Sequence, residues 1–292
     1  MRALLTGATG FIGSHVARAL LARRDEVHAL SRPDSSRWRL SDVEDRISWH
    51  EPGPTDGELR ATIEAIGPDV AIHLAWYAEP GRYLDAAPEN LQSLAGAVRL
   101  FDALLASGCR HVVLGGTCLE NRPATTIYAA TKAAMHRVAE HLGAAGLAST
   151  CAHIFYPYGP GEDQRRAVPS VINALLRGHP IAVGDGSQER DYLHVADVAT
   201  ALCALVDGSA PPSVDICTGQ TTPVREVFEM IGIKTGHPEL IRFGELAPDD
   251  RGFPSTGDPS PLAHRGWRPN FDLSAGLDDS IQYWRGQQRR SA

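Results

Sequence analysis

A glycine-spaced loop near the N-terminus constrains the fold of this chain more than any other feature. Residues 2–6 form a short apolar stretch, and Ile12, Val16 and Leu20 recur at helical spacing after the loop. A strand, a tight glycine turn and a helix in this order are typical of a phosphate-binding turn, with an anion at the helix N-terminus. We therefore predict a dinucleotide site that includes Gly7, Gly10, Phe11, Ile12 and Gly13.

A second feature, about 120 residues further on, indicates chemistry. Tyr128 and Lys132 are four residues apart, so on a helix they lie on one face. The Lys132 ammonium can then lie near the Tyr128 phenol and favour its phenolate. A free tyrosine has a pKa near ~10, so a base that works near neutrality needs a shift of roughly 3 units. Alone, the pair is more typical of a solvated surface helix, but with the glycine loop a catalytic pair is favoured.

Together with two later motifs, Tyr158-Gly-Pro-Gly161 and Arg190-Asp-Tyr-Leu-His-Val-Ala-Asp197, these features resemble the extended short-chain dehydrogenase/reductases. This family contains nucleotide-sugar epimerases, dehydratases and reductases, and the resemblance covers nearly the whole chain. It implies an α/β fold: a doubly wound Rossmann-type parallel sheet with a smaller, discontinuous C-terminal substrate domain. We expect residues 1–156 and 186–217 to bind the dinucleotide, and residues 157–185 and 218–292 to form the substrate domain.

Composition narrows the function. The 292 residues carry a net charge of −7, which argues against binding to nucleic acid. No run of 18 apolar residues predicts a membrane span, and the N-terminus enters the first strand with no room for a signal peptide. The five cysteines include no C-x-x-C pair, so we expect free thiols in a reducing compartment and no structural metal. These features favour a cytoplasmic enzyme with a small-molecule substrate.

A second strand is predicted from Glu26 to Leu30, after the strand predicted at residues 2–6, and its end indicates the cofactor. Relatives that bind NAD usually carry an acidic residue there, which accepts hydrogen bonds from the ribose 2′-hydroxyl. This chain has Ser31 and Arg32, which favour a 2′-phosphate. We therefore predict NADP rather than NAD, with a solvated loop arginine as the alternative. The resemblance also implies that Leu74 and Ala75 line the cofactor ribose and that Lys132 holds the nicotinamide ribose.

On the substrate side, the resemblance implies that Thr117 donates a hydrogen bond to the substrate oxygen beside Tyr128. The 4,6-dehydratases carry Asp and Glu just after this threonine, where this chain has Cys118 and Leu119, which cannot perform that proton chemistry. Only ten residues separate Thr117 from Tyr128, about half the usual length, so details of the substrate pocket cannot be carried over.

Four further residues complete the expected substrate set. Arg190 matches the arginine that contacts the diphosphate in relatives, with an ion pair to Asp191 or Asp197 as the alternative. The other three are the weaker candidates Asn90, Tyr156 and Arg251. The helix from Asn90 to Leu105 and the Tyr128 helix often form a dimer seam in relatives, so we expect a homodimer, although packing on the sheet explains these helices equally well.

The leading hypothesis is NADPH-dependent reduction of a 4-keto nucleotide sugar. A nucleotide-sugar epimerase and a reductase of a non-nucleotide ketone or aldehyde are the enzyme alternatives. A catalytically silent NADP-binding regulatory protein is the alternative of another class, and the intact set of Thr117, Tyr128 and Lys132 counts against it. The sequence does not identify the base, the sugar or the stereochemistry of the product.

Overall fold

The computed structural model describes residues 1–53, 55–121, 125–206, 210–247, 253 and 255–291. Its centre is a seven-stranded sheet in the order β11-β6-β5-β4-β1-β2-β3, in which every neighbouring pair is parallel. In that order the strands span Ser213–Ile216, Ala148–Ile154, His111–Thr117, Val70–His73, Arg2–Thr6, Glu26–Leu30 and Ser48–His50. The chain moves outward from β1 to β3 and then returns beside β1 as β4. This reversal creates a crevice at the carboxyl ends of β1 and β4, where such sheets bind ligands.

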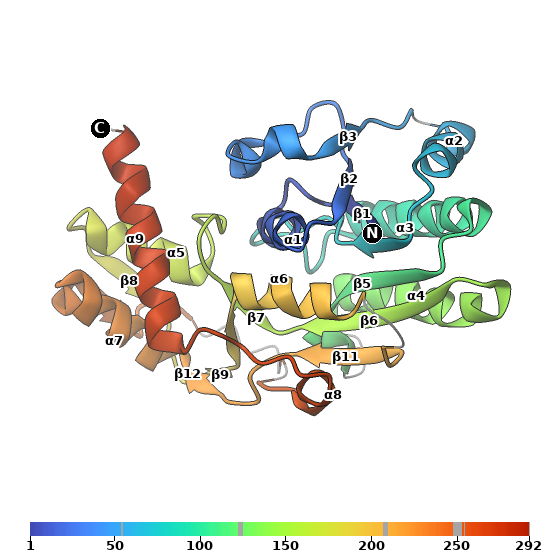
Figure 1. Cartoon of the computed structure of the whole chain (residues 1–292). Coiled ribbons are helices and arrows are strands. Elements are labelled where there is room, and N and C mark those ends of the chain that lie inside the picture. Colours follow the sequence, from blue (N-terminus) through green and yellow to red (C-terminus); the bar gives the residue numbers. More distant parts are fainter. Residues whose placement is uncertain (54, 122–124, 207–209, 248–252, 254, 292) are drawn as a thin grey trace.

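Helices cover both faces of the sheet (Figure 1). On one face α1 (Phe11–Ala22) packs against α6 (Val195–Ala204), and the short α8 (Ser260–His264) adds Leu262 to the same apolar core. On the other face α2 (Asp56–Ile66), α3 (Ala87–Ser107) and α4 (Ile127–His141) pack side by side over a second core. The buried strands are therefore apolar on both sides, as expected for a parallel sheet.

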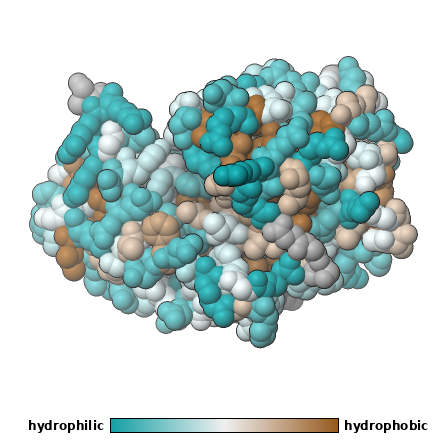
Figure 2. All heavy atoms as spheres, in the orientation of Figure 1, coloured by the Kyte–Doolittle hydropathy of each residue, from teal (hydrophilic) through white to brown (hydrophobic). Residues whose placement is uncertain are grey.

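A smaller lobe has its own apolar core, which includes Phe228, Ile281 and Trp284. It consists of α5 (Ala167–Leu176), β8 (Ile181–Val183), α7 (Val224–Thr235), β13 (Ile241–Phe243) and α9 (Leu273–Ser291). Two short strand pairs lie beside it: β7 (Tyr156–Tyr158) with β10 (Tyr192–His194), and β9 (Glu189–Arg190) with β12 (Thr222–Pro223). Figure 1 shows this lobe to the left of the main sheet, and Figure 2 shows a notch between the two parts.

The doubly wound fold predicted from the sequence is confirmed, and strands 2–6 and 26–30 have the predicted bounds. The domain division stays a prediction; Leu262 and Trp267, both assigned to the substrate side, pack in the core of the larger part. At the C-terminus, α9 continues to Ser291 although its last residues are polar. Its buried Ile281 and Trp284 anchor the helix against α5 and α7, and that tertiary packing outweighs the polar local sequence.

Candidate active site

The glycine loop between β1 and α1 is shaped for a close approach of backbone. Gly7 has a φ of +76°, and a Cβ there would lie 2.7 Å from the Ala75 nitrogen. A Cβ on Gly13 would lie 2.0 Å from the Gly7 oxygen, so neither position admits a side chain. The chain thus brings the ends of β1 and β4 together at the crevice, where Leu74 and Ala75 flank Gly7. That these two residues line the cofactor ribose stays a prediction.

The start of α1 is open to an anion. The helix begins at Phe11 after the N-cap Gly10, and no side chain caps it. The first N–H groups of a helix have no partner within the helix and carry its positive dipole end. A cradle without side chains and an uncapped helix N-terminus fit a dinucleotide diphosphate. Phe11, Ile12 and Gly13 provide this first turn, and their binding of a dinucleotide stays a prediction.

The end of β2 places the residues that were predicted to select the cofactor. Ser31 donates its backbone N–H to His50, and its hydroxyl is buried without a partner among the described residues. The Arg32 side chain is 84% exposed, and its Nε lies 3.6 Å from Asp34. Ser31 therefore offers a fixed, unused hydroxyl, whereas Arg32 is a mobile charge that Asp34 partly neutralises.

Thr117 is the last residue of β5, and Tyr128 and Lys132 lie in the first turns of α4, which packs on β5. Thr126 caps α4 by accepting the Ala129 N–H at 3.1 Å, and this cap places Tyr128 and Lys132 on one helix face. The Lys132 Nζ donates to the Gly115 oxygen at 2.5 Å and lies 6.0 Å from the centre of the Tyr128 ring.

Burial dominates the protonation of this pair. It raises the pKa of the Tyr128 phenol well above its ordinary value, and it lowers the pKa of Lys132 to about 8. The sequence-based expectation that Lys132 favours the Tyr128 phenolate therefore fails for the protein alone, because loss of solvation penalises the phenolate more strongly. Tyr128 is a protonated acid at neutral pH, and that state is the one a reduction requires.

Two aromatic side chains that the sequence analysis missed enclose the pair. The Lys132 ammonium lies 4.2 Å from the centre of the Trp76 ring, and Tyr83 packs edge-on against Tyr128 at 4.8 Å. Both residues belong to the segment after β4, and only tertiary contacts bring them to α4. No periodicity in the sequence could have identified them.

Asn90 does not have the predicted role. It is fully buried, and its oxygen accepts the Trp76 Nε1–H at 2.9 Å. Its amide nitrogen donates to the backbone oxygens of Tyr83 and Ala86 at 2.7 and 2.8 Å. All its polar atoms are therefore engaged by protein groups, and Asn90 positions the segment that carries Trp76 and Tyr83 instead of contacting substrate.

Arg190 lies beside Tyr156, as two predicted substrate residues should. Its guanidinium carbon is 5.0 Å from the centre of the Tyr156 ring. The alternative, an ion pair with Asp191 or Asp197, is disfavoured because other donors occupy those carboxylates. Asp191 accepts hydrogen bonds from Thr218, Gly219 and Thr256, and Asp197 accepts from the backbone of Asn270 and Phe271. Arg251 lies outside the described residues.

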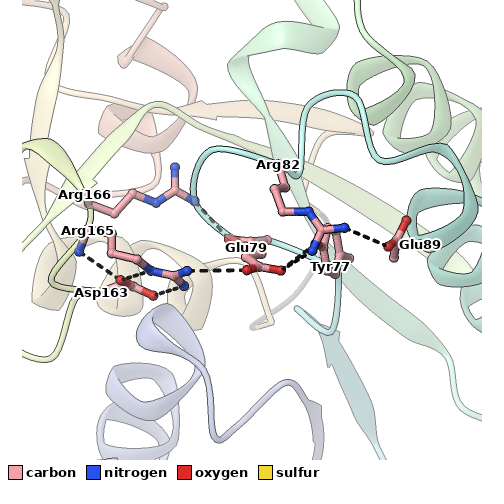
Figure 3. Close-up of polar contacts among 8 residues, drawn as sticks. Tyr77, Glu79, Arg82, Glu89, Asp163, Arg165 and Arg166 are labelled. Carbon is pink, nitrogen blue, oxygen red and sulfur yellow. Dashed lines mark hydrogen bonds and ion pairs between the residues drawn. The ribbon is translucent and has the colours of Figure 1, made fainter.

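A chain of polar contacts joins the segment after β4 to the start of α5 (Figure 3). Arg165 forms ion pairs with Asp163 at 2.9 Å and with Glu79 at 3.4 Å. Arg166 donates to the Ala78 oxygen at 3.2 Å and stacks over Tyr83, with its guanidinium carbon 4.7 Å from the ring centre. This network holds the Tyr83 segment against Tyr128 from the side of the smaller lobe.

Comparisons with known proteins agree with this geometry. Residues 3–217 match the model of the NAD dependent epimerase/dehydratase family. The chain is 28% identical to the UDP-glucose 4-epimerase of Mycolicibacterium smegmatis, over 99% of this chain and 100% of that protein. It is 26% identical to a dTDP-4-dehydro-6-deoxy-D-allose reductase of a Streptomyces species, over 98% and 97% of the two chains. The solved structure of MoeE5 in complex with UDP-glucuronic acid and NAD is 28% identical, with a TM-score of 0.81 and full coverage of both chains.

The chain belongs to the NAD dependent epimerase/dehydratase family, as the sequence motifs indicated. It is an enzyme of the NAD(P)-dependent oxidoreductase and epimerase class. In the part of the chain that the structure describes, no helix is long and apolar enough to cross a membrane.

Proposed function

We propose that this enzyme reduces the 4-keto group of a nucleotide sugar with NADPH. The observation that carries the proposal is the placement of Thr117, Tyr128 and Lys132 beside the β1–β4 crevice, with Tyr128 held protonated by burial. A protonated phenol is the form that can donate to an oxygen that gains negative charge.

The chain's own residues divide the work of the reduction. Bound NADPH supplies the hydride. Tyr128 donates its proton to the substrate oxygen, and Thr117 donates a second hydrogen bond that strengthens as charge develops there. Lys132, already held by the Gly115 oxygen, orients the nicotinamide ribose, and the tyrosinate that remains takes up a proton from solvent. Lys132 is buried, whereas Tyr128 is only partly buried.

The side chains after Thr117 argue against a dehydratase. Cys118 is buried, and burial raises the pKa of its thiol to about 11, so it is a poor acid or base near neutrality. Leu119 carries no proton. The nearest carboxylate, Glu120, accepts the Thr117 N–H at 2.7 Å with one oxygen and directs the other toward His136 and His153. Elimination of water from the sugar lacks its acid and base here.

NADPH is favoured over NADH by the end of β2. The buried Ser31 hydroxyl has no partner among the described residues, and Arg32 needs only a change of rotamer to meet a 2′-phosphate. A charge-assisted contact to phosphate contributes roughly 1.5–3 kcal/mol. NAD in the related MoeE5 complex supports the alternative that this chain also binds NAD.

The nucleotide part of the substrate is assigned to the side of Arg190 and Tyr156, where a guanidinium can contact a diphosphate. We also propose a homodimer through α3 and α4, because Leu91, Val98 and Val138 on these helices are large apolar residues that are more than 40% exposed. A cytoplasmic location remains our prediction.

The second candidate is a 4-epimerase, favoured by the identity to the mycobacterial UDP-glucose 4-epimerase. An epimerase returns the hydride to the sugar and leaves its cofactor unchanged overall. A third possibility is reduction of a non-nucleotide ketone, which needs the same three catalytic residues but not Arg190. Activity on a nucleotide sugar can therefore be compared directly with activity on a small ketone.

One set of assays separates these activities. The purified chain is given a 4-keto-6-deoxyhexose nucleotide with NADPH or NADH, and separately UDP-glucose with NAD, with product analysis by NMR. We expect stoichiometric oxidation of NADPH, weaker use of NADH, and no UDP-galactose. Arg32→Ala should lose the preference for NADPH without losing turnover with NADH. Formation of UDP-galactose without net cofactor oxidation would assign the chain as an epimerase instead.

A further inference from the structure

A cluster of four side chains lies beside Thr117, near the end of β5. Glu120 follows β5, His136 is in α4, and Cys151 and His153 are neighbours on one face of β6. Their ligand atoms all lie within 4.8 Å of one another. Figure 1 shows that β5, β6 and α4 adjoin, although the four residues span 33 positions of sequence from Glu120 to His153.

The cluster is buried but poorly satisfied by hydrogen bonds. The side chains of Glu120, His153 and His136 are only 3, 10 and 16% exposed. From the Glu120 Oε2, the His136 Nδ1 and the His153 Nε2 are each 4.0 Å away, and the Cys151 Sγ is 3.8 Å away. The two histidine distances are too long for hydrogen bonds. Four polar groups thus face one another, and the thiol of Cys151, which donates to the Glu120 Oε2, is the one that forms a hydrogen bond to another member of the cluster.

His153 is oriented as metal-binding histidines are. Its Nδ1 lies 3.1 Å from the Asp215 Oδ1, and a carboxylate can only accept, so Nδ1 carries the proton. In the neutral ring the lone pair then lies on Nε2, which points toward Glu120 and has no hydrogen-bond partner in the described part of the chain. A carboxylate behind a histidine in this way fixes the ring and increases its basicity as a ligand.

The backbone also leaves room for the cluster. A Cβ on Gly116 would lie 2.6 Å from the Cys151 Sγ and 2.9 Å from the Glu120 Oε1. Any larger residue at this point of β5 would displace two of the four side chains.

The donor set selects the kind of ion. One thiolate, two imidazoles and one carboxylate suit a thiophilic first-row cation such as Zn²⁺, and they do not suit Mg²⁺ or Ca²⁺, which take oxygen ligands. Tetrahedral zinc holds such atoms about 3.3–3.5 Å apart. The three distances from the Glu120 Oε2 are 3.8–4.0 Å, and all pairs of ligand atoms lie within 4.8 Å, so the side chains must close in by up to about 1.3 Å to reach this geometry.

We propose that Glu120, His136, Cys151 and His153 form a structural site for Zn²⁺ or a similar divalent transition metal. Four protein ligands make a closed site, and binding exchanges the Cys151 thiol proton for the metal. The metal ties β6 and α4 to the turn that carries Thr117, since Glu120 also accepts the Thr117 N–H. This site revises the sequence-based expectation of no metal, which considered only cysteine pairs, and it is independent of which substrate the enzyme reduces.

Metal content and cobalt spectroscopy test the site on the whole, untagged chain. After dialysis against a weak chelator, elemental analysis should find near-stoichiometric zinc. Removal of zinc with a strong chelator should lower the melting temperature, and added zinc should restore it. Replacement by Co²⁺ should give intense visible bands of tetrahedral cobalt and a thiolate-to-cobalt band in the near ultraviolet.

Variants assign the bands to the cluster. Cys151→Ser should lose the thiolate band, and His153→Ala and Glu120→Gln should lower zinc affinity by at least roughly tenfold. Cys109→Ser, which removes a buried thiol outside the cluster, should leave the thiolate band and the zinc affinity unchanged. If Cys151→Ser does not fold, the other two variants and the wild-type spectrum decide. Wild-type protein that binds neither zinc nor cobalt, or a thiolate band that persists in Cys151→Ser, would show that the cluster is a metal-free polar network and overturn the proposal.

Discussion

The proposed cofactor side and the proposed substrate side of this enzyme are built in different ways. On the cofactor side, backbone meets backbone: Gly7 and Gly13 leave no space for a side chain, and Lys132 is buried against a carbonyl and an aromatic ring. On the substrate side, the contacts are between longer, more exposed side chains, such as Arg165 with Glu79. The first arrangement tolerates little change, whereas the second can be altered without disturbing the fold. The same family can therefore keep one chemistry and vary its substrates.

The largest effect should come from the acid itself. Tyr128→Phe keeps the ring and its contact with Tyr83 and removes only the hydroxyl. We expect turnover to fall by roughly 10²–10⁴-fold, the usual range for general acid catalysis, with little change in NADPH affinity. Steady-state kinetics and a fluorescence titration of NADPH measure the two quantities. Tyr83→Phe is the matched control and should retain most activity; an equal loss in both variants would mean that Tyr128 acts through packing alone.

Substitutions at Gly13 and Gly10 should have different effects, the first on the stability of the fold and the second on the affinity for NADPH. A Cβ at Gly13 would lie 2.0 Å from the Gly7 oxygen, whereas at Gly10 it would lie 3.2 Å from the same atom. Gly13→Ala should lower the free energy of unfolding by about 1–3 kcal/mol, as overpacking does. Gly10→Ala should leave stability nearly unchanged and weaken NADPH binding, because it stands where the diphosphate approaches α1. Chemical denaturation measures the stability of the two variants, and titration measures their affinity for NADPH. Similar losses of stability in Gly13→Ala and Gly10→Ala would contradict the difference expected from the two Cβ distances.

The smallest effect should appear in the ion pairs of Figure 3. Glu79→Gln removes the partner of Arg165 across the gap between the segment after β4 and α5. Both side chains are well exposed, so solvent and salt screen their attraction. We expect the KM for the nucleotide sugar to rise by no more than roughly twofold at low salt and the difference to vanish at high salt. A large loss of turnover instead would show that this network controls Tyr128 directly.

The same contrast explains what could be predicted from the sequence. The glycine loop, β1 and β2, and the shared face of Tyr128 and Lys132 depend on local spacing, which a sequence displays. The substrate role predicted for Asn90 failed because its partners, Trp76 and Tyr83, are set by a turn whose path has no local signal. The phenolate expected at Tyr128 failed because burial is a tertiary property. The Glu120 cluster forms because β6 lies beside β5 in the folded protein. The Cys151-x-His153 spacing is the only part of it that the sequence displays.

The central claim is that NADPH delivers hydride to a sugar carbon beside Tyr128, and an isotope experiment tests it most directly. The enzyme, in excess, is mixed with a 4-keto-6-deoxyhexose nucleotide and NADPH that carries deuterium at the transferable position. We expect one deuterium at C4 of the product in a single turnover, and a much slower transfer with Tyr128→Phe. A product without deuterium, or transfer at the normal rate in Tyr128→Phe, would contradict it.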